Sequence, residues 1–166
     1  MTMTQWIARA ALAACVVGGT VAPAAASEPW PPFSVAGPEG GRWTSVSIGA
    51  SSRALVVYVV PGSPSAERLF AALDEWQVQG LEAHLLVLVA APLDRAREYM
   101  ARWETVLPPG LAWAADDRRE AWQALGITGS PVLFGVANGQ VAWKVAGVLN
   151  EPGMLESIVR TWVEQR

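Results

Sequence analysis

Two apolar runs joined by a segment of helical periodicity constrain this chain more than any other feature. ALVVYVV at 54–60 and LEAHLLVLVA at 81–90 are continuous rather than alternating, which is typical of strands buried on both faces. Between them, residues 64–79 carry a single apolar stripe made of Leu69, Phe70, Leu73 and Trp76. Strands joined through a helix run parallel, so we expect a sheet covered by helices on both faces.

The alternation of strands and helices continues along the 166-residue chain, whose length is typical of one domain. An N-terminal β-hairpin is predicted over 32–48, and Asn138-Gly139 predicts a second hairpin because this dipeptide favours a tight turn. The other predicted elements are a helix at 92–107, a strand at 111–115, a helix at 117–125 and a helix at 151–164. The fold class is therefore α/β, with a central mixed β-sheet flanked by helices.

Residues 1–26 have the pattern of a secretory signal peptide. One positive charge, Arg9, precedes an apolar stretch at 10–21, and small residues follow, with cleavage expected after Ala26. The protein is thus predicted to be periplasmic or otherwise extracytoplasmic, with its folded domain at 27–166. If the segment were retained, it would anchor the protein to the membrane.

The single cysteine, Cys15, lies inside this segment. After cleavage the exported chain would contain no thiol, so it could form neither a disulfide nor a thiolate metal site. The carboxylates of Asp94, Glu98 and Glu104 have no His or Cys partner on their helix and do not predict a metal site. There is no phosphate loop or dinucleotide motif, and the formal net charge of −3 gives no basis for nucleic-acid binding. No metal or cofactor is predicted.

The stretch VYVVPGSPSAERLF at 57–70 forms a corner between the first buried strand and its helix. Many enzymes carry a reactive side chain at such a corner, because free N–H groups at a helix N-terminus stabilise an anion. Ser63 fits the N-cap position and Pro64 the first helical position. A serine nucleophile needs a general base, and the only histidine, His84, falls within a predicted apolar strand, where it is interpreted as a core or edge residue.

Two parts of the chain resemble a known family. GITGSPVLFGVANGQVAWKVAG at 126–147 is similar to the cis-proline segment of thioredoxin-like proteins, with Pro131 at the cis-proline position. PFSVAGPEGG and ALVVYVVPGSPSAERL are similar to the N-terminal hairpin, central strand and active-site helix of the secreted branch, which includes TlpA, ResA and MauD-related redoxins. The resemblance implies a thioredoxin-like fold over nearly the whole exported chain.

The chain departs from this family at the active site. The family's Cys-x-x-Cys motif falls on Ser63-Pro64-Ser65-Ala66, so serine and alanine replace the two cysteines. In a peroxiredoxin register, Pro61 and Ser65 match, but the reactive cysteine position is Arg68. Thiol–disulfide exchange requires a thiolate, so the active site is predicted to be degenerate and redox-inactive.

One property of the family does not need sulfur. In relatives, the residue before the cis-proline offers main-chain N–H and C=O groups to an extended segment of the partner, which is recognition by strand addition. The resemblance therefore implies a peptide-binding groove formed by Gly62, Ser63, Ser130 and Pro131. Such a protein would bind an envelope protein or peptide as an assembly or scaffold factor. Two alternatives stay open: Pro131 only shapes the fold, or the chain is a thiol-disulfide oxidoreductase or peroxidase-related enzyme that acts through a non-standard site.

Two other groups of residues have competing interpretations. The charged run Asp116–Glu120 is interpreted as a solvated loop and first helical turn rather than as a carboxylate cluster. Trp30 and Trp43, two of nine tryptophans, either pack in the core or form an exposed aromatic contact surface.

Overall fold

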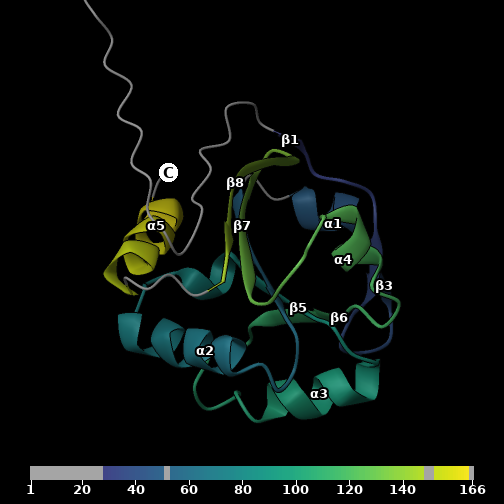
Figure 1. Cartoon of the computed structure of the whole chain (residues 1–166), viewed down its shortest axis with the longest axis horizontal. Helices are drawn as coiled ribbons and strands as arrows, with labels where there is room; N and C mark the ends of the chain where they lie inside the picture. The colour runs from purple at the N-terminus through teal and green to yellow at the C-terminus, as the bar shows by residue number, and fades with distance from the viewer. Residues whose placement is uncertain (1–27, 51–52, 148–151, 165–166) are drawn as a thin grey trace, which may run out of the picture.

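The computed structural model describes residues 28–50, 53–147 and 152–164. The predicted signal peptide, with Cys15, lies outside the described residues. Within them, eight strands form one mixed sheet in the order β1-β8-β7-β4-β5-β6-β2-β3 (Figure 1). β4, β5 and β6 are parallel, and the other neighbouring strands are antiparallel. The strands are β1 (Glu28–Pro29), β2 (Ser34–Ala36), β3 (Arg42–Thr44), β4 (Arg53–Val59), β5 (Leu85–Val89), β6 (Ala112–Ala115), β7 (Val132–Ala137) and β8 (Gln140–Ala146).

Helices cover both faces of this sheet. Leu55 and Val57 on β4 pack with apolar side chains of α2, α3 and α5, whereas Val56 and Tyr58 belong to a second cluster with α1 and α4. Strand side chains alternate between the two faces, so the continuous apolar run of β4 reflects burial on both. The predicted α/β architecture is confirmed. The helices are α1 (Ser45–Gly49), α2 (Pro64–Trp76), α3 (Leu93–Ala101), α4 (Glu120–Ala124) and α5 (Pro152–Glu164), with a 3₁₀ turn η1 (Leu81–Ala83).

Both predicted hairpins are present. β7 and β8 pair about Asn138 and Gly139, whose φ angles of 51° and 71° suit a tight turn. β2 and β3 pair in the N-terminal hairpin. The prediction that this hairpin extends to residue 48 is wrong, because a short helix, α1, begins after Thr44. Thr44 and Ser47 form a reciprocal capping box, in which each hydroxyl accepts a hydrogen bond from the other residue's N–H.

Three helices are shorter than predicted. The helix expected at 117–125 spans only Glu120–Ala124, because Arg119 before it adopts a left-handed φ of 57°. The helix expected at 64–79 ends at Trp76, because Gln77 adopts a left-handed φ of 47°. The helix expected at 92–107 ends at Ala101 and continues only as turns. Neither of these two C-terminal boundaries has a glycine or proline directly after it, and those are the residues that mark helix ends most clearly in a sequence.

Trp30 packs in the core, and Trp43 packs against it. Trp30 is 9% exposed, and its ring meets Phe33 and Phe134 edge-on, with centroid distances of 5.4 and 5.8 Å. Trp43 is half-buried and lies so close to Gly37 that a Cβ there would be 2.6 Å from the indole Nε1. The core interpretation is therefore confirmed for Trp30, whereas Trp43 packs against the same cluster and stays partly exposed.

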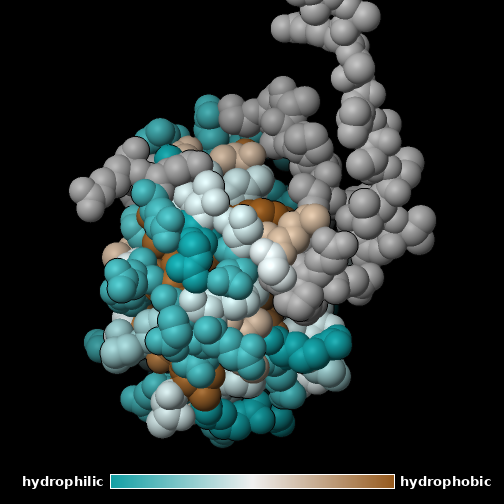
Figure 2. Space-filling model, turned by 90° about the vertical axis from the view of Figure 1, so that its left-hand side faces the viewer, coloured by the Kyte–Doolittle hydropathy of each residue, from teal (hydrophilic) through white to brown (hydrophobic). Residues whose placement is uncertain are grey.

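Figure 2 shows the face of the molecule where α5 and α2 lie at the left of Figure 1. Hydrophilic side chains dominate the described part of this face, and hydrophobic ones form small separate patches. In residues 28–50, 53–147 and 152–164, no helix has the combined length and apolar character that a membrane crossing requires.

Candidate functional site

The corner between β4 and α2 has the backbone geometry that the sequence predicts. Gly62 has a φ of 79°, Ser63 is the N-cap of α2, and Pro64 begins the helix. The Ser63 carbonyl accepts hydrogen bonds from the N–H groups of Ala66 and Glu67, at 3.0 and 3.1 Å. The Ser63 side chain makes no capping hydrogen bond, contrary to what its position suggests. Main-chain bonds therefore hold this corner, and the serine hydroxyl does not contribute.

A second loop lies against this corner. The peptide bond between Ser130 and Pro131 is cis, as the resemblance implies. Pairing of β4 with β7 reaches Tyr58 and Val132, and directly beyond it the N–H of Val60 donates to the Ser130 Oγ at 2.8 Å. The structure thus places the two loops of the predicted groove side by side, with two groove residues on each.

The main chain of Ser130 is left without partners by this arrangement. The next hydrogen bond along the β4–β7 pairing goes to the Ser130 side chain instead of its carbonyl. Within the described part of the chain, neither the N–H nor the C=O of Ser130 has a hydrogen-bond partner. The Pro131 carbonyl, in contrast, accepts a hydrogen bond from the Gly147 N–H at 2.8 Å. Ser130 is half-buried, and main-chain groups in such positions are normally hydrogen-bonded. The free N–H and C=O of Ser130 can therefore pair with an added strand.

No imidazole lies where it could activate Ser63. The strand predicted at 81–90 begins only at Leu85, and His84 lies just before it. β4 and β5 run parallel. His84 therefore lies at the amino-terminal end of these strands, whereas Ser63 lies beyond their carboxyl-terminal end. The His84 Nδ1 lies 3.3 Å from the Arg53 carbonyl oxygen. His84 is the only histidine of the chain, and the described residues contain no group of His, Cys, Asp and Glu able to hold a metal ion.

Asp116 shows where the sequence interpretation is wrong. It does not lie in a solvated loop but is 1% exposed. Its carboxylate accepts hydrogen bonds from the Tyr58 hydroxyl at 2.7 Å and from the N–H groups of Ala121 and Trp122 at 3.2 and 3.0 Å. Burial, together with the bond to Asp116, raises the pKa of Tyr58 above its ordinary value. The sequence clue was a tyrosine within a buried strand, because a buried hydroxyl needs a partner.

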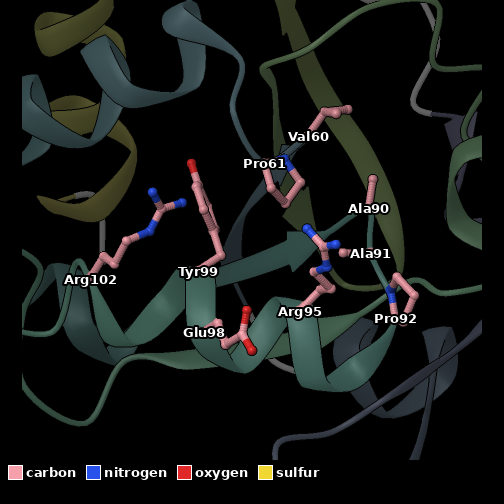
Figure 3. Close-up of a pocket in the computed structure, with 9 residues that line it drawn as sticks. All are labelled: Val60, Pro61, Ala90, Ala91, Pro92, Arg95, Glu98, Tyr99 and Arg102. Atoms are coloured by element: carbon pink, nitrogen blue, oxygen red, sulfur yellow. The ribbon is translucent and has the colours of Figure 1, made fainter.

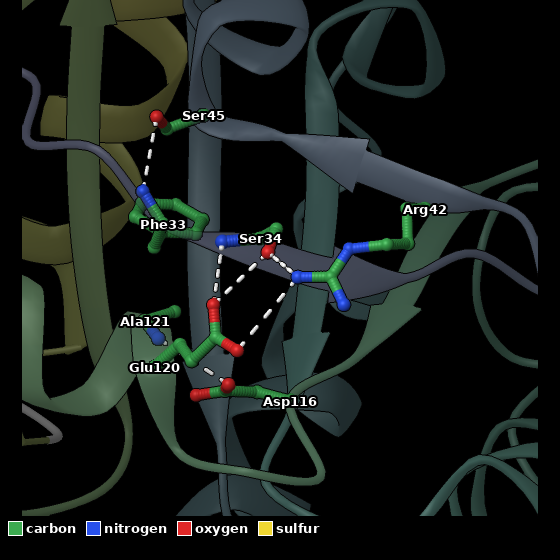
Figure 4. A network of polar contacts seen from close by, with 7 residues as sticks. All are labelled: Phe33, Ser34, Arg42, Ser45, Asp116, Glu120 and Ala121. Atoms are coloured by element: carbon green, nitrogen blue, oxygen red, sulfur yellow. Dashed lines mark hydrogen bonds and ion pairs between the residues drawn. The ribbon is translucent and has the colours of Figure 1, made fainter.

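Glu120, at the end of the same charged run, joins α4 to the N-terminal hairpin (Figure 4). Its carboxylate accepts hydrogen bonds from the Ser34 hydroxyl at 2.9 Å and the Ser34 N–H at 3.2 Å, and it lies 3.8 Å from the Arg42 guanidinium. The hydrogen bonds from Ser34 hold the pKa of Glu120 below its usual value, and Arg42 adds to the effect. This contact is structural, because it fixes the hairpin beside β6.

A pocket of about 590 Å³ opens beside the β4–α2 corner (Figure 3). We call it the Tyr99 pocket. The sequence does not reveal it, because its residues come from the loops after β4 and β5 and from α3 with its C-cap, three segments that only the fold brings together. They are Val60, Pro61, Ala90, Ala91, Pro92, Arg95, Glu98, Tyr99 and Arg102.

Solved structures with the same architecture include bacterial redox proteins. A proposed thiol:disulfide interchange protein DsbE of Chlorobium tepidum matches with a TM-score of 0.66 and 16% identity, over 82% of this chain and 96% of its own. A secreted disulfide oxidoreductase of Mycobacterium tuberculosis, homologous to E. coli DsbE, matches with a TM-score of 0.59 and 13% identity, over 78% of this chain and 95% of its own. The exposed lipoprotein thioredoxin of Streptococcus pneumoniae matches with a TM-score of 0.54 and 13% identity, over 78% of this chain and 98% of its own.

No family model and no curated protein matches the chain by sequence. At these identities the structural likeness establishes the fold, and it agrees with the order and pairing of the strands. The single cysteine of the chain, at position 15, precedes all of the described residues. The chain therefore has the thioredoxin-like fold of DsbE-type redox proteins, with no cysteine in the part of the chain that forms it.

Proposed function

We propose that this protein is an exported thioredoxin-like protein that binds an extended segment of another protein without exchanging disulfides. The groove comprises Gly62, Ser63, Ser130 and Pro131. The partner is an envelope protein or peptide, which the protein holds as an assembly or scaffold factor.

The observation that carries this proposal is the unpartnered main chain of Ser130. Its N–H and C=O groups have no hydrogen-bond partner in the described residues, while the side chain is fixed on Val60. A donor and an acceptor on one residue can pair with one residue of an extended peptide, as in an antiparallel ladder. This recognition uses main-chain groups, so it does not depend on the missing cysteines.

Two further observations support export and the absence of redox chemistry. Residues 1–26 have the signal-peptide pattern, and two of the structural neighbours are by their names a secreted and an exposed protein. Ser63 and Ala66 occupy the positions that the resemblance gives to the two cysteines, and the only histidine of the chain lies at the opposite end of the parallel strands from Ser63. A serine hydroxyl without a base is not a nucleophile at neutral pH.

Binding is tested by titrating the ¹⁵N-labelled protein with a blocked peptide rich in valine and threonine. We expect amide shifts at Gly62, Ser63 and Ser130. Ser130→Pro removes the main-chain donor and should weaken binding about tenfold. Ser130→Ala is the matched control, because it also loses the hydroxyl but keeps the N–H. Equal weakening by both variants would show that the main chain of Ser130 does not bind the peptide.

The second candidate function is a thiol-disulfide oxidoreductase with a non-standard site, which the names of the structural neighbours favour. Reduction of insulin by the purified protein separates the two candidates. We expect no turnover, and none in the Cys15→Ser variant, which controls for the one thiol of the chain. Turnover that survives in Cys15→Ser would overturn the binding proposal in favour of an enzyme.

A further inference from the structure

The Tyr99 pocket shares a wall with the proposed groove. Val60 and Pro61 line the pocket, and Val60 also donates to Ser130. A segment bound along Ser130 therefore runs past the loop that separates it from the pocket. Because side chains of an extended segment alternate, those on one side of the bound segment can reach over this loop.

The pocket contains a buried donor. Tyr99 is 2% exposed, and its hydroxyl has no hydrogen-bond partner among the described residues. Burial raises the pKa of Tyr99 to about 12, so the hydroxyl keeps its proton at neutral pH. Buried hydroxyls are rarely left unpaired, so a ligand that brings an acceptor would satisfy this one.

The rim of the pocket is positively charged. Arg95 and Arg102 extend their guanidinium groups to the side of α3 where Pro61 lies, and the Tyr99 hydroxyl is on the same side (Figure 3). Arg102 also lies over the Tyr99 ring, 5.0 Å from its centroid. Glu98 is the one acidic residue of the lining, and within the described chain Arg95 has no ion-pair partner.

Within the lining, two guanidinium groups against one carboxylate give an excess of positive charge, and Glu67 on α2, outside the lining, is a further acidic group that acts on Tyr99. Guanidinium groups and a phenol all donate hydrogen bonds, and in an unmodified peptide segment the side-chain group that accepts them while carrying negative charge is the carboxylate of aspartate or glutamate. The apolar remainder, Val60, Pro61 and the loop at 90–92, suits the methylene part of an acidic side chain.

We propose that the Tyr99 pocket binds an aspartate or glutamate side chain of the extended segment that pairs with Ser130. The inference rests on the proposed groove and specifies its partner: a segment with an acidic residue beside the paired position. Arg95 and Arg102 bind the carboxylate, and the Tyr99 hydroxyl donates to it. Glu98 opposes a second negative charge, so one acidic residue is preferred over two.

Three probes test this on the purified protein: a blocked peptide rich in valine and threonine with one central glutamate, its glutamine counterpart, and glutarate. We expect the glutamate peptide to bind about tenfold more tightly than the glutamine peptide, with the difference falling at high salt. Arg95→Gln and Tyr99→Phe should each reduce this preference. Arg97→Gln makes the same charge change on α3 but outside the pocket lining, and should leave it unchanged.

The outcomes separate the pocket from the groove. If the two peptides bind equally well, the pocket assignment is wrong while the groove remains. If neither peptide binds, both the groove and the pocket assignment are wrong. If glutarate binds as tightly as the glutamate peptide, the pocket recognises free carboxylates rather than a partner segment. Loss of the preference in Arg97→Gln to the same extent would show a general charge effect and overturn the assignment.

Discussion

Of the three strand-to-helix corners at the carboxyl ends of the parallel strands β4, β5 and β6, those after β4 and β6 are constructed in opposite ways. After β4, Ser63 caps α2 through its carbonyl alone, and its side chain makes no capping bond. After β6, the Asp116 side chain is buried and accepts three hydrogen bonds, two of them from N–H groups at the start of α4. One corner leaves polar groups open, and the other satisfies them within the protein.

The two corners differ in whether their polar groups are used within the fold. The α4 corner must hold a five-residue helix and a buried tyrosine, so its polar groups are committed to the fold. The α2 corner starts a thirteen-residue helix whose apolar face packs in the core. The helix is therefore held in place without a side-chain cap from Ser63. The unpartnered polar groups of Ser130 and Tyr99 lie around the α2 corner.

The largest change is expected from restoring sulfur to the α2 corner. In a Cys15→Ser background, Ser63→Cys with Ala66→Cys should give a protein that reduces insulin, whereas we expect no turnover from the Cys15→Ser parent. The helix N-terminus would lower the pKa of a thiol at position 63, and the geometry of this corner matches the resemblance. Ser63→Cys alone lacks a resolving partner and controls for a lone thiol. A folded double variant without activity would show that the corner differs from that of the family.

Removing the carboxylate of the α4 corner should cause the largest loss of stability. Asp116→Ala leaves the Tyr58 hydroxyl and two helix N–H groups buried without a partner. We expect the free energy of unfolding, measured in urea, to fall by about 3–4 kcal/mol. Asp117→Ala removes a neighbouring exposed carboxylate and should change it by less than about 0.5 kcal/mol. Similar losses in both variants would contradict the buried network.

Alkaline pH tests the two buried tyrosines, which are the only tyrosines of the chain. The folded pKa of Tyr99 is raised to about 12, and burial raises that of Tyr58 as well. The tyrosine pKa values in the folded state lie above the unfolded value of ~10. The contribution of the protonated tyrosines to stability is therefore complete below pH ~10, and it decreases above pH ~10, where the unfolded state releases protons. At pH 11 the free energy of unfolding should be lower by about 1.4 kcal/mol for each tyrosine. Tyrosinate absorbance that appears near pH 10 in the folded protein would contradict both burials.

The sequence predicts the fold well because its strongest patterns are those of burial. The continuous run of β4 requires cover on both faces, and Asn138-Gly139 sets the hairpin of β7 and β8. The site is only partly predictable. Ser63 has the residue type and position of a side-chain cap, yet a sequence does not show which rotamer its hydroxyl adopts. Asp116 stands among four charged residues, and only the fold shows that it alone turns inward to Tyr58.

The smallest expected effect gives the sharpest test of the comparison between the two corners. An N-cap serine normally loses about 1 kcal/mol on substitution by alanine, because an N–H of the first turn loses its acceptor. Here the Ser63 hydroxyl makes no such bond, so Ser63→Ala should change the free energy of unfolding in urea by less than about 0.5 kcal/mol. Thr44→Ala is the positive control, because the Thr44 hydroxyl does accept the Ser47 N–H. A full capping loss at Ser63 would mean that its hydroxyl is committed to the helix in solution, and that both corners use their side chains for stability.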